Sequence, residues 1–150
     1  MRKIMNAVVA AAVAFAGWTG VANAGLMSAK RPVIAILGSA LYVGTAEGHL
    51  SGAGTLAIRS QVHPSVTCTG EFTSSAEAGG VGELRCSNGA SAKFRFERLT
   101  VFSGHGSGNF GKGTMSFTYG LTAEESKPYL KLAPGKQLKQ NGEELALVDS

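Results

Sequence analysis

The chain has 150 residues, of which 14 are Lys or Arg and 10 are Asp or Glu, giving a formal net charge of +4. This surplus is too small to favour nucleic-acid binding, so we expect no nucleic-acid partner. The length allows one domain with a single core rather than two.

Residues 1–24 contain the three parts of an export signal in order. Arg2 and Lys3 provide a positive start, an apolar stretch follows, and an A-x-A cleavage site ends at Ala24. The uninterrupted apolar run of residues 7–17 is much shorter than the roughly 20 residues that span a bilayer, which argues against a retained membrane anchor. The pattern therefore predicts a signal peptide that is cleaved after Ala24.

The mature chain, residues 25–150, is expected to be a single β-rich domain in the periplasm or secreted. Removing Arg2 and Lys3 leaves 12 basic and 10 acidic residues, a net charge of +2. No later apolar segment is long enough to cross a membrane, so we expect no transmembrane segment after cleavage. The two cysteines, Cys68 and Cys86, are predicted to form a disulfide in that oxidising compartment. Their spacing is not that of a C-x-x-C redox pair.

The first strands are predicted upstream of the cysteines. Residues 32–43 are apolar and partly continuous, which indicates one strand covered on both faces or lying across the mouth of a barrel. In residues 44–58 the even positions are Gly, Ala, Leu or Ile, which predicts a single inward face with a bend near residues 48–52. Residues 59–64 are interpreted as a connector.

Alternation with a period of two is clearest from residue 66 to residue 97. Even positions in residues 66–72, 80–86 and 90–96 are small or apolar, whereas most odd positions are polar or charged. Successive side chains of a strand point to opposite faces. The pattern predicts three strands that bury their even-numbered residues.

The disulfide predicts a register for these strands. If Cys68 and Cys86 face each other on antiparallel strands, paired positions add up to 154, and Phe72 then lies opposite Gly82. In the next hairpin, a three-residue loop ending at Gly89 in the left-handed region keeps the buried faces consistent. This loop also sets Glu83 opposite Lys93 on the solvent side.

The buried positions change from even to odd further along the chain, where Met115 and Phe117 are apolar. We predict the change either at a β-bulge at Arg98–Leu99, which would turn Leu99 and Val101 inward, or in the glycine stretch of residues 104–111. A phosphate-binding loop would need a βαβ unit around the glycines, so this stretch is interpreted as a mobile loop at the barrel rim. The candidate rim residues are Gly104, His105, Gly106, Gly108, Asn109, Gly111 and Lys112.

A short G-x-G-x-apolar unit occurs four times, at residues 52–56, 80–84, 106–110 and 111–115. Both glycines and the apolar residue of each unit share one face of a strand. Inward glycines need a reason, such as sharp coiling, close approach of another backbone, or space for an aromatic ring from a neighbouring strand. A small, highly curved barrel provides all three.

The C-terminal part contains the one helical signal. Thr122 and Glu125 have the spacing of a capping box, which predicts a helix of one or two turns. At Asn141-Gly142, a two-residue type I′ turn would close a last hairpin and pair Leu138 with Leu145.

These patterns predict an all-β fold: a small antiparallel β-barrel or closed β-sandwich of about seven to nine Gly-rich strands, with one disulfide and at most one short helix. Barrels of this size are either filled by side chains or hold one small ligand. The residues expected to line such a ligand are Leu56, Phe94, Phe96, Phe117 and Tyr119.

Motifs for catalysis and for cofactors are missing from the sequence, and we expect no cofactor. The mature chain has a single Asp, Asp149, which excludes most aspartate-based catalytic and calcium sites. The histidines do not have metal-ligand spacing, so no metal site is predicted. His49 and His105 are weak candidates for a shared metal or anion site, if two hairpin ends meet at one rim.

We therefore expect a non-enzymatic protein of the cell envelope. It would act as a binding or structural module through its rim loops or barrel interior, on another envelope protein, a surface polymer or a small apolar ligand. The alternative is a hydrolase or a metal-dependent enzyme whose site is assembled from dispersed His, Glu and Arg residues. A hollow apolar interior favours the ligand, whereas converging buried His, Glu and Arg side chains favour the enzyme.

Overall fold

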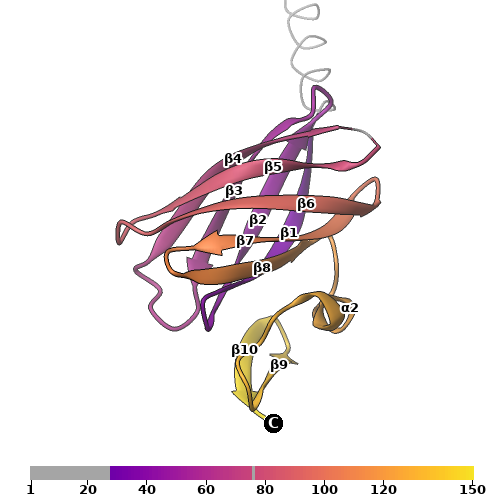
Figure 1. Cartoon of the computed structure of the whole chain (residues 1–150). Helices are drawn as coiled ribbons and strands as arrows, with labels where there is room; N and C mark the ends of the chain where they lie inside the picture. Colours follow the sequence, from indigo (N-terminus) through magenta and orange to yellow (C-terminus); the bar gives the residue numbers. More distant parts are fainter. Residues whose placement is uncertain (1–27, 76) are drawn as a thin grey trace, which may run out of the picture.

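The structure is a computed structural model that describes residues 28–75 and 77–150, so the predicted signal peptide lies outside the described residues. Eight antiparallel strands form a closed barrel in which β1 pairs with β8 (Figure 1). The all-β barrel prediction is confirmed. The strands are β1 (Ser28–Leu37), β2 (Ala40–His49), β3 (Ala53–Ser60), β4 (Thr67–Ser75), β5 (Gly79–Cys86), β6 (Ser91–Thr100), β7 (Ser103–Phe110) and β8 (Gly113–Tyr119).

The predicted register around the disulfide is confirmed. Cys68 on β4 is bonded to Cys86 on β5, and Phe72 pairs with Gly82 in the same ladder. Gly89 has a φ of 91°, and the Cys86 amide donates to the Ala90 carbonyl at 2.8 Å, as the three-residue loop requires. Alternation and one cross-link are therefore enough to predict this half of the barrel residue by residue.

The N-terminal apolar segment, residues 32–43, is a hairpin and not one strand. The turn at Gly38-Ser39 separates β1 from β2, and Gly38 has a φ of 63° that favours glycine. The prediction that this segment is covered on both faces is confirmed, because every residue from Val33 to Leu37 is buried. The predicted bend near residues 48–52 is also a complete turn, between β2 and β3.

The predicted β-bulge exists between Arg98 and Thr100, but its predicted consequence is wrong. Leu99 and Val101 are exposed at 45% and 71% instead of turning inward. Arg98 pairs with Gly104, so even positions stay inward along β7. The change of phase occurs at the two-residue turn of residues 111–112, because a loop of that length pairs an even position with an odd one.

The glycine stretch is a barrel strand, and the prediction of a rim loop over residues 104–109 is wrong. Gly104, His105, Gly106, Gly108 and Asn109 belong to β7, and only Gly111 and Lys112 form a turn. Gly104 and Gly106 are needed in the strand because an aromatic ring of a paired residue occupies the space of the missing side chain. At Gly108 the backbone of β6 occupies that space. In the described part of the chain there are five glycine–ring pairs of this kind: Gly54–Phe72, Gly80–Phe96, Gly82–Phe94, Gly104–Tyr119 and Gly106–Phe117.

The chain after β8 folds outside the barrel (Figure 1). The predicted capping box is confirmed, since Thr122 Oγ1 accepts from the Glu125 amide and Glu125 Oε1 accepts from the Thr122 amide, at 3.2 and 3.0 Å. This segment also contributes a second core against the outer face of β1 and β2, through Ile34, Ile36, Leu41, Ala123, Leu130 and Leu138. Its elements are α2 (Ala123–Ser126), the 3-10 helix η1 (Lys127–Tyr129), β9 (Lys136–Asn141) and β10 (Glu144–Asp149).

The last hairpin is present, but its predicted turn is displaced by one residue. Asn141 pairs with Glu144 and Leu138 with Leu147, so the turn consists of Gly142 and Glu143. Gly142, with a φ of 60°, takes the first central position, which is typical of a type II′ turn and not of type I′. The partner of Leu138 is therefore Leu147 and not Leu145, a shift of two positions along β10. Because side chains alternate between the two faces of a strand, a shift of two leaves the apolar face of the hairpin unchanged.

Candidate functional site: the barrel cavity

The barrel encloses a cavity of about 1010 Å³. Leu56, Phe94, Phe96, Phe117 and Tyr119, the five predicted lining residues, all lie on its wall. The cavity opens at the end of the barrel that carries the β2–β3, β4–β5 and β6–β7 turns. Known small-molecule sites have volumes of roughly 300–1,000 Å³, so the hollow has the size of a ligand site.

Aromatic rings line the cavity in an edge-to-face arrangement. The centroids of Phe72 and Phe96 are 5.6 Å apart, those of Phe96 and Tyr119 are 5.7 Å apart, and the ring planes of both pairs meet at 87°. Phe94 and Phe117 form a similar pair at 5.2 Å and 80°. Each of these rings also lies against a glycine of an adjacent strand. The wall is therefore preformed, and the rings follow the barrel instead of filling its centre.

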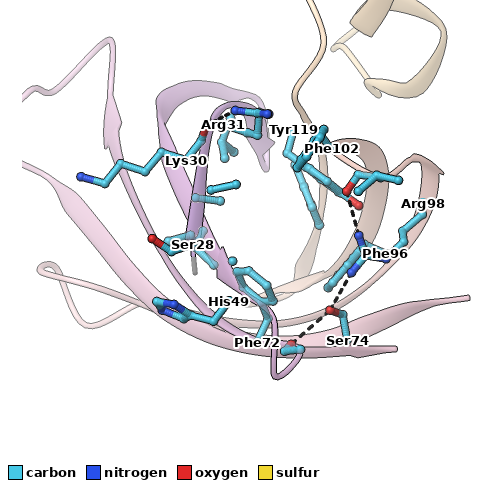
Figure 2. A pocket seen from close by; sticks show the side chains of 18 of the residues that line it. Ser28, Lys30, Arg31, His49, Phe72, Ser74, Phe96, Arg98, Phe102 and Tyr119 are labelled. Atoms are coloured by element: carbon cyan, nitrogen blue, oxygen red, sulfur yellow. Dashed lines mark hydrogen bonds between the residues drawn. The ribbon is translucent and has the colours of Figure 1, made fainter. Parts of the chain in front are cut away.

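Arg98 lies at the mouth and is held by three neutral acceptors (Figure 2). Its Nε donates to the Ser75 carbonyl at 3.1 Å, its Nη1 to the Val101 carbonyl at 3.0 Å, and its Nη2 to Ser74 Oγ at 3.0 Å. These bonds join the ends of β4 and β6. They also fix the direction of the guanidinium without neutralising its charge.

Arg31 lies at the same mouth on β1. Its guanidinium carbon is 4.3 Å from the centroid of the Phe102 ring, a distance typical of a cation–π contact. Lys30 and His49 also line this opening. Among the described residues, the cavity is lined by no Asp or Glu, and no ion pair involves Arg31 or Arg98. The mouth is therefore positively charged.

The Tyr119 hydroxyl is buried and has no hydrogen-bond partner among the residues that the structure describes. Burial raises the pKa of this hydroxyl, and the positive charge of Arg98 partly opposes the increase. Buried polar atoms almost always have a partner. The hydrogen-bonding capacity of this hydroxyl is therefore unused by the described residues.

The two candidate histidines do not form a common site. His105 lies on the outer side of β7 and stacks on Tyr129, with centroids 4.3 Å apart and planes 17° apart, whereas His49 lies at the mouth. Within residues 28–75 and 77–150, no three His, Cys, Asp or Glu side chains are close enough to hold one metal ion. The turn of Gly111 and Lys112 lies at the opposite end of the barrel from the mouth.

Sequence reasoning missed Arg98, Arg31 and Phe102 as residues of the site. Arg98 continues the even-numbered inward series of Phe94 and Phe96, so the alternation itself contained the signal. The expectation that charged residues face solvent outweighed it.

No helix in the described part of the chain is long and apolar enough to cross a lipid bilayer. Searches for similar proteins found no matching family model, no matching curated protein and no matching solved structure.

Proposed function

We propose that this chain is an exported, non-enzymatic protein of the cell envelope that binds a small apolar ligand inside its barrel. The observation that carries the proposal is the open cavity of about 1010 Å³, whose wall consists mainly of aliphatic and aromatic side chains. Protein interiors normally contain few voids larger than a water molecule. A hollow of this size, with a preformed wall and an open mouth, is typical of a barrel that holds a ligand.

Export is supported by the sequence and is consistent with the disulfide. Residues 1–24 have the order of charge, apolar stretch and cleavage site that directs a chain out of the cytoplasm. The Cys68–Cys86 bond is of the kind that persists in an oxidising compartment. In the periplasm or outside the cell, such a barrel would shield an apolar compound from water.

The test is binding of N-phenylnaphthylamine, an uncharged dye that fluoresces in apolar surroundings, to protein expressed with its own leader. Ala46 lines the cavity, and Ala46→Phe would fill part of it. Ala57, on the outer face of β3, provides a matched control, because Ala57→Phe adds the same ring in solvent. We expect Ala46→Phe to weaken dye binding at least tenfold and Ala57→Phe to leave it unchanged.

Two results would contradict this function: no dye binding by the parent protein, or equal binding by the parent and Ala46→Phe. A third measurement addresses export directly. Mass spectrometry of the protein recovered from the cell envelope should find Gly25 as the first residue.

A further inference from the structure

We propose that the ligand is an anionic amphiphile whose apolar chain occupies the cavity and whose oxyanion head group is bound at the mouth by Arg98 and Tyr119. This inference rests on the proposed function and specifies the ligand class of the same site. It follows from three separate features: a row of three paired residues, the unused hydrogen-bonding capacity of two side chains, and the charge of the mouth.

Arg98 and Tyr119 are brought together by the strand register. Gly104 on β7 pairs with Arg98 on β6 and with Tyr119 on β8, so the three residues form one row across the barrel wall. Because the central residue is glycine, no side chain stands between the other two. Both side chains line the cavity, close to its mouth (Figure 2).

Each of these two side chains has hydrogen-bond donors to spare. A guanidinium carries five N–H groups, and the described contacts of Arg98 use three of its nitrogen atoms once each. The Tyr119 hydroxyl has no partner among the described residues. A carboxylate or phosphate oxygen is the acceptor that such donors bind best. One head group at this position would satisfy both residues.

The charge of the mouth selects the sign of the head group. Arg31 lies at the same opening as Arg98, and no carboxylate of the described residues lines the cavity. Arg98 is paired only with uncharged acceptors, so its positive charge remains available. An anion is attracted to this mouth, and a cation is repelled.

The wall below the mouth selects the rest of the ligand. Past Tyr119 the inward residues are Phe117 and Met115 on β8, with Phe94 and Phe96 on the neighbouring part of the wall. These side chains offer no hydrogen bonds to a sugar or a peptide. The molecule that fits has an apolar body and a charged group at one end only.

The experiment measures how three ligands with the same chain displace N-phenylnaphthylamine: palmitate, hexadecyl phosphate and uncharged hexadecanol. The first two separate a carboxylate from a phosphate head group, and a preference for either over hexadecanol supports the proposal. We expect at least a tenfold preference in the parent protein. Arg98→Gln and Tyr119→Phe should each reduce the affinity for the anionic ligand by about fivefold or more, while hexadecanol binding stays within about twofold.

Lys93→Gln is the matched control, because Lys93 lies on the outer face of β6 and its side chain is 85% exposed. Removing this charge should leave all three affinities unchanged. Arg98→Gln could unfold the mouth, since Arg98 joins two strand ends. Tyr119→Phe removes only an unpartnered hydroxyl, so it keeps the test valid if the arginine variant does not fold.

Equal affinities for hexadecanol and both anions in the parent protein would overturn this inference and leave the proposed function standing. An unchanged preference in Tyr119→Phe and in a folded Arg98→Gln would also overturn it. Failure of the parent protein to bind the uncharged dye would instead overturn the proposed function itself.

Discussion

The two ends of the barrel use the same alternating strands in opposite ways. At the closed end, Leu84, Tyr42 and the Cys68–Cys86 bond are buried, and none of them lines the cavity. At the open end the inward residues are mostly aromatic rings paired with glycines, and the centre is empty. Alternation of apolar and polar residues therefore determines which side chains point inward, but not whether they fill the interior.

The difference comes from where each ring can lie. A ring opposite a glycine rests on the neighbouring strand, in the space that a Cβ would otherwise take, and stays close to the wall. Leu84 also pairs with a glycine, Gly70, but the atoms nearest to a Cβ at Gly70 belong to the backbone of Glu83 and Leu84, so no side chain rests there. Glycines in these strands, usually a cost in a sheet, hold the cavity open.

The largest expected effect concerns the closed end. Replacing both cysteines by alanine removes a cross-link between residues 18 apart in sequence, which should lower the free energy of unfolding by about 3 kcal/mol. Urea unfolding of the parent protein and of the double variant measures this loss, and unfolding of the parent protein with reductant provides a second comparison. Because the bond lies at the filled end, the double variant should bind N-phenylnaphthylamine like the parent protein. A loss of dye binding in the folded variant would show that the two ends are not independent.

A smaller effect is expected from one methyl group at the open end. Gly54→Ala would place a Cβ in overlap with the Phe72 ring and 2.5 Å from the Glu47 carbonyl oxygen, at a cost of about 2 kcal/mol. Gly48 is the cross-strand partner of Gly54 and provides the control, because its Cβ would lie 4.0 Å from the same ring. Gly48→Ala should change stability by less than about 0.5 kcal/mol.

Urea unfolding of the two variants provides the measurement. Equal destabilisation would mean that the cost comes from strand glycine in general and not from contact with the ring. It would remove the explanation given above for the open cavity.

Sequence reasoning was accurate where a strand has one face in solvent, and it failed where both faces of a strand are covered. From Val66 to Phe96 the strands have one dry and one wet face, so alternation and one sulfur pair predict both face and register. In β1 and β2 the outer face is covered by the C-terminal segment, and alternation is lost because both faces are apolar. The turn at Gly38-Ser39 was therefore missed.

The candidate site was predictable only in part. Its apolar lining follows from inward position, which is why Phe94 and Phe117 were identified. The hollow centre depends on ring orientation against glycines in other strands, a long-range property that composition does not show. Arg98 was missed because a charged residue at the end of a buried series is an exception to the usual placement, and such exceptions mark function.

The smallest effect expected concerns Tyr119, where the apolar wall meets the charged mouth. Burial raises the pKa of its hydroxyl above 10.0, so the folded protein favours the neutral form more than the unfolded chain does. The resulting stability is fully present below the unfolded pKa and is lost as the pH rises through the folded pKa. Tyr119→Phe should therefore lose less stability than the parent protein between about pH 9 and pH 11.

Urea unfolding across this range measures the difference between the two proteins, in which all other titrating groups cancel. Arg98→Gln sharpens the test, because Arg98 lowers the pKa of Tyr119 and its removal should move the tyrosinate absorbance to still higher pH. Bound palmitate would replace the positive surroundings by a negative group and shift the same absorbance upward again. If the stability of the parent protein and of Tyr119→Phe fell in parallel at alkaline pH, the Tyr119 hydroxyl would be in contact with water. The apolar wall would then not extend as far as the charged mouth.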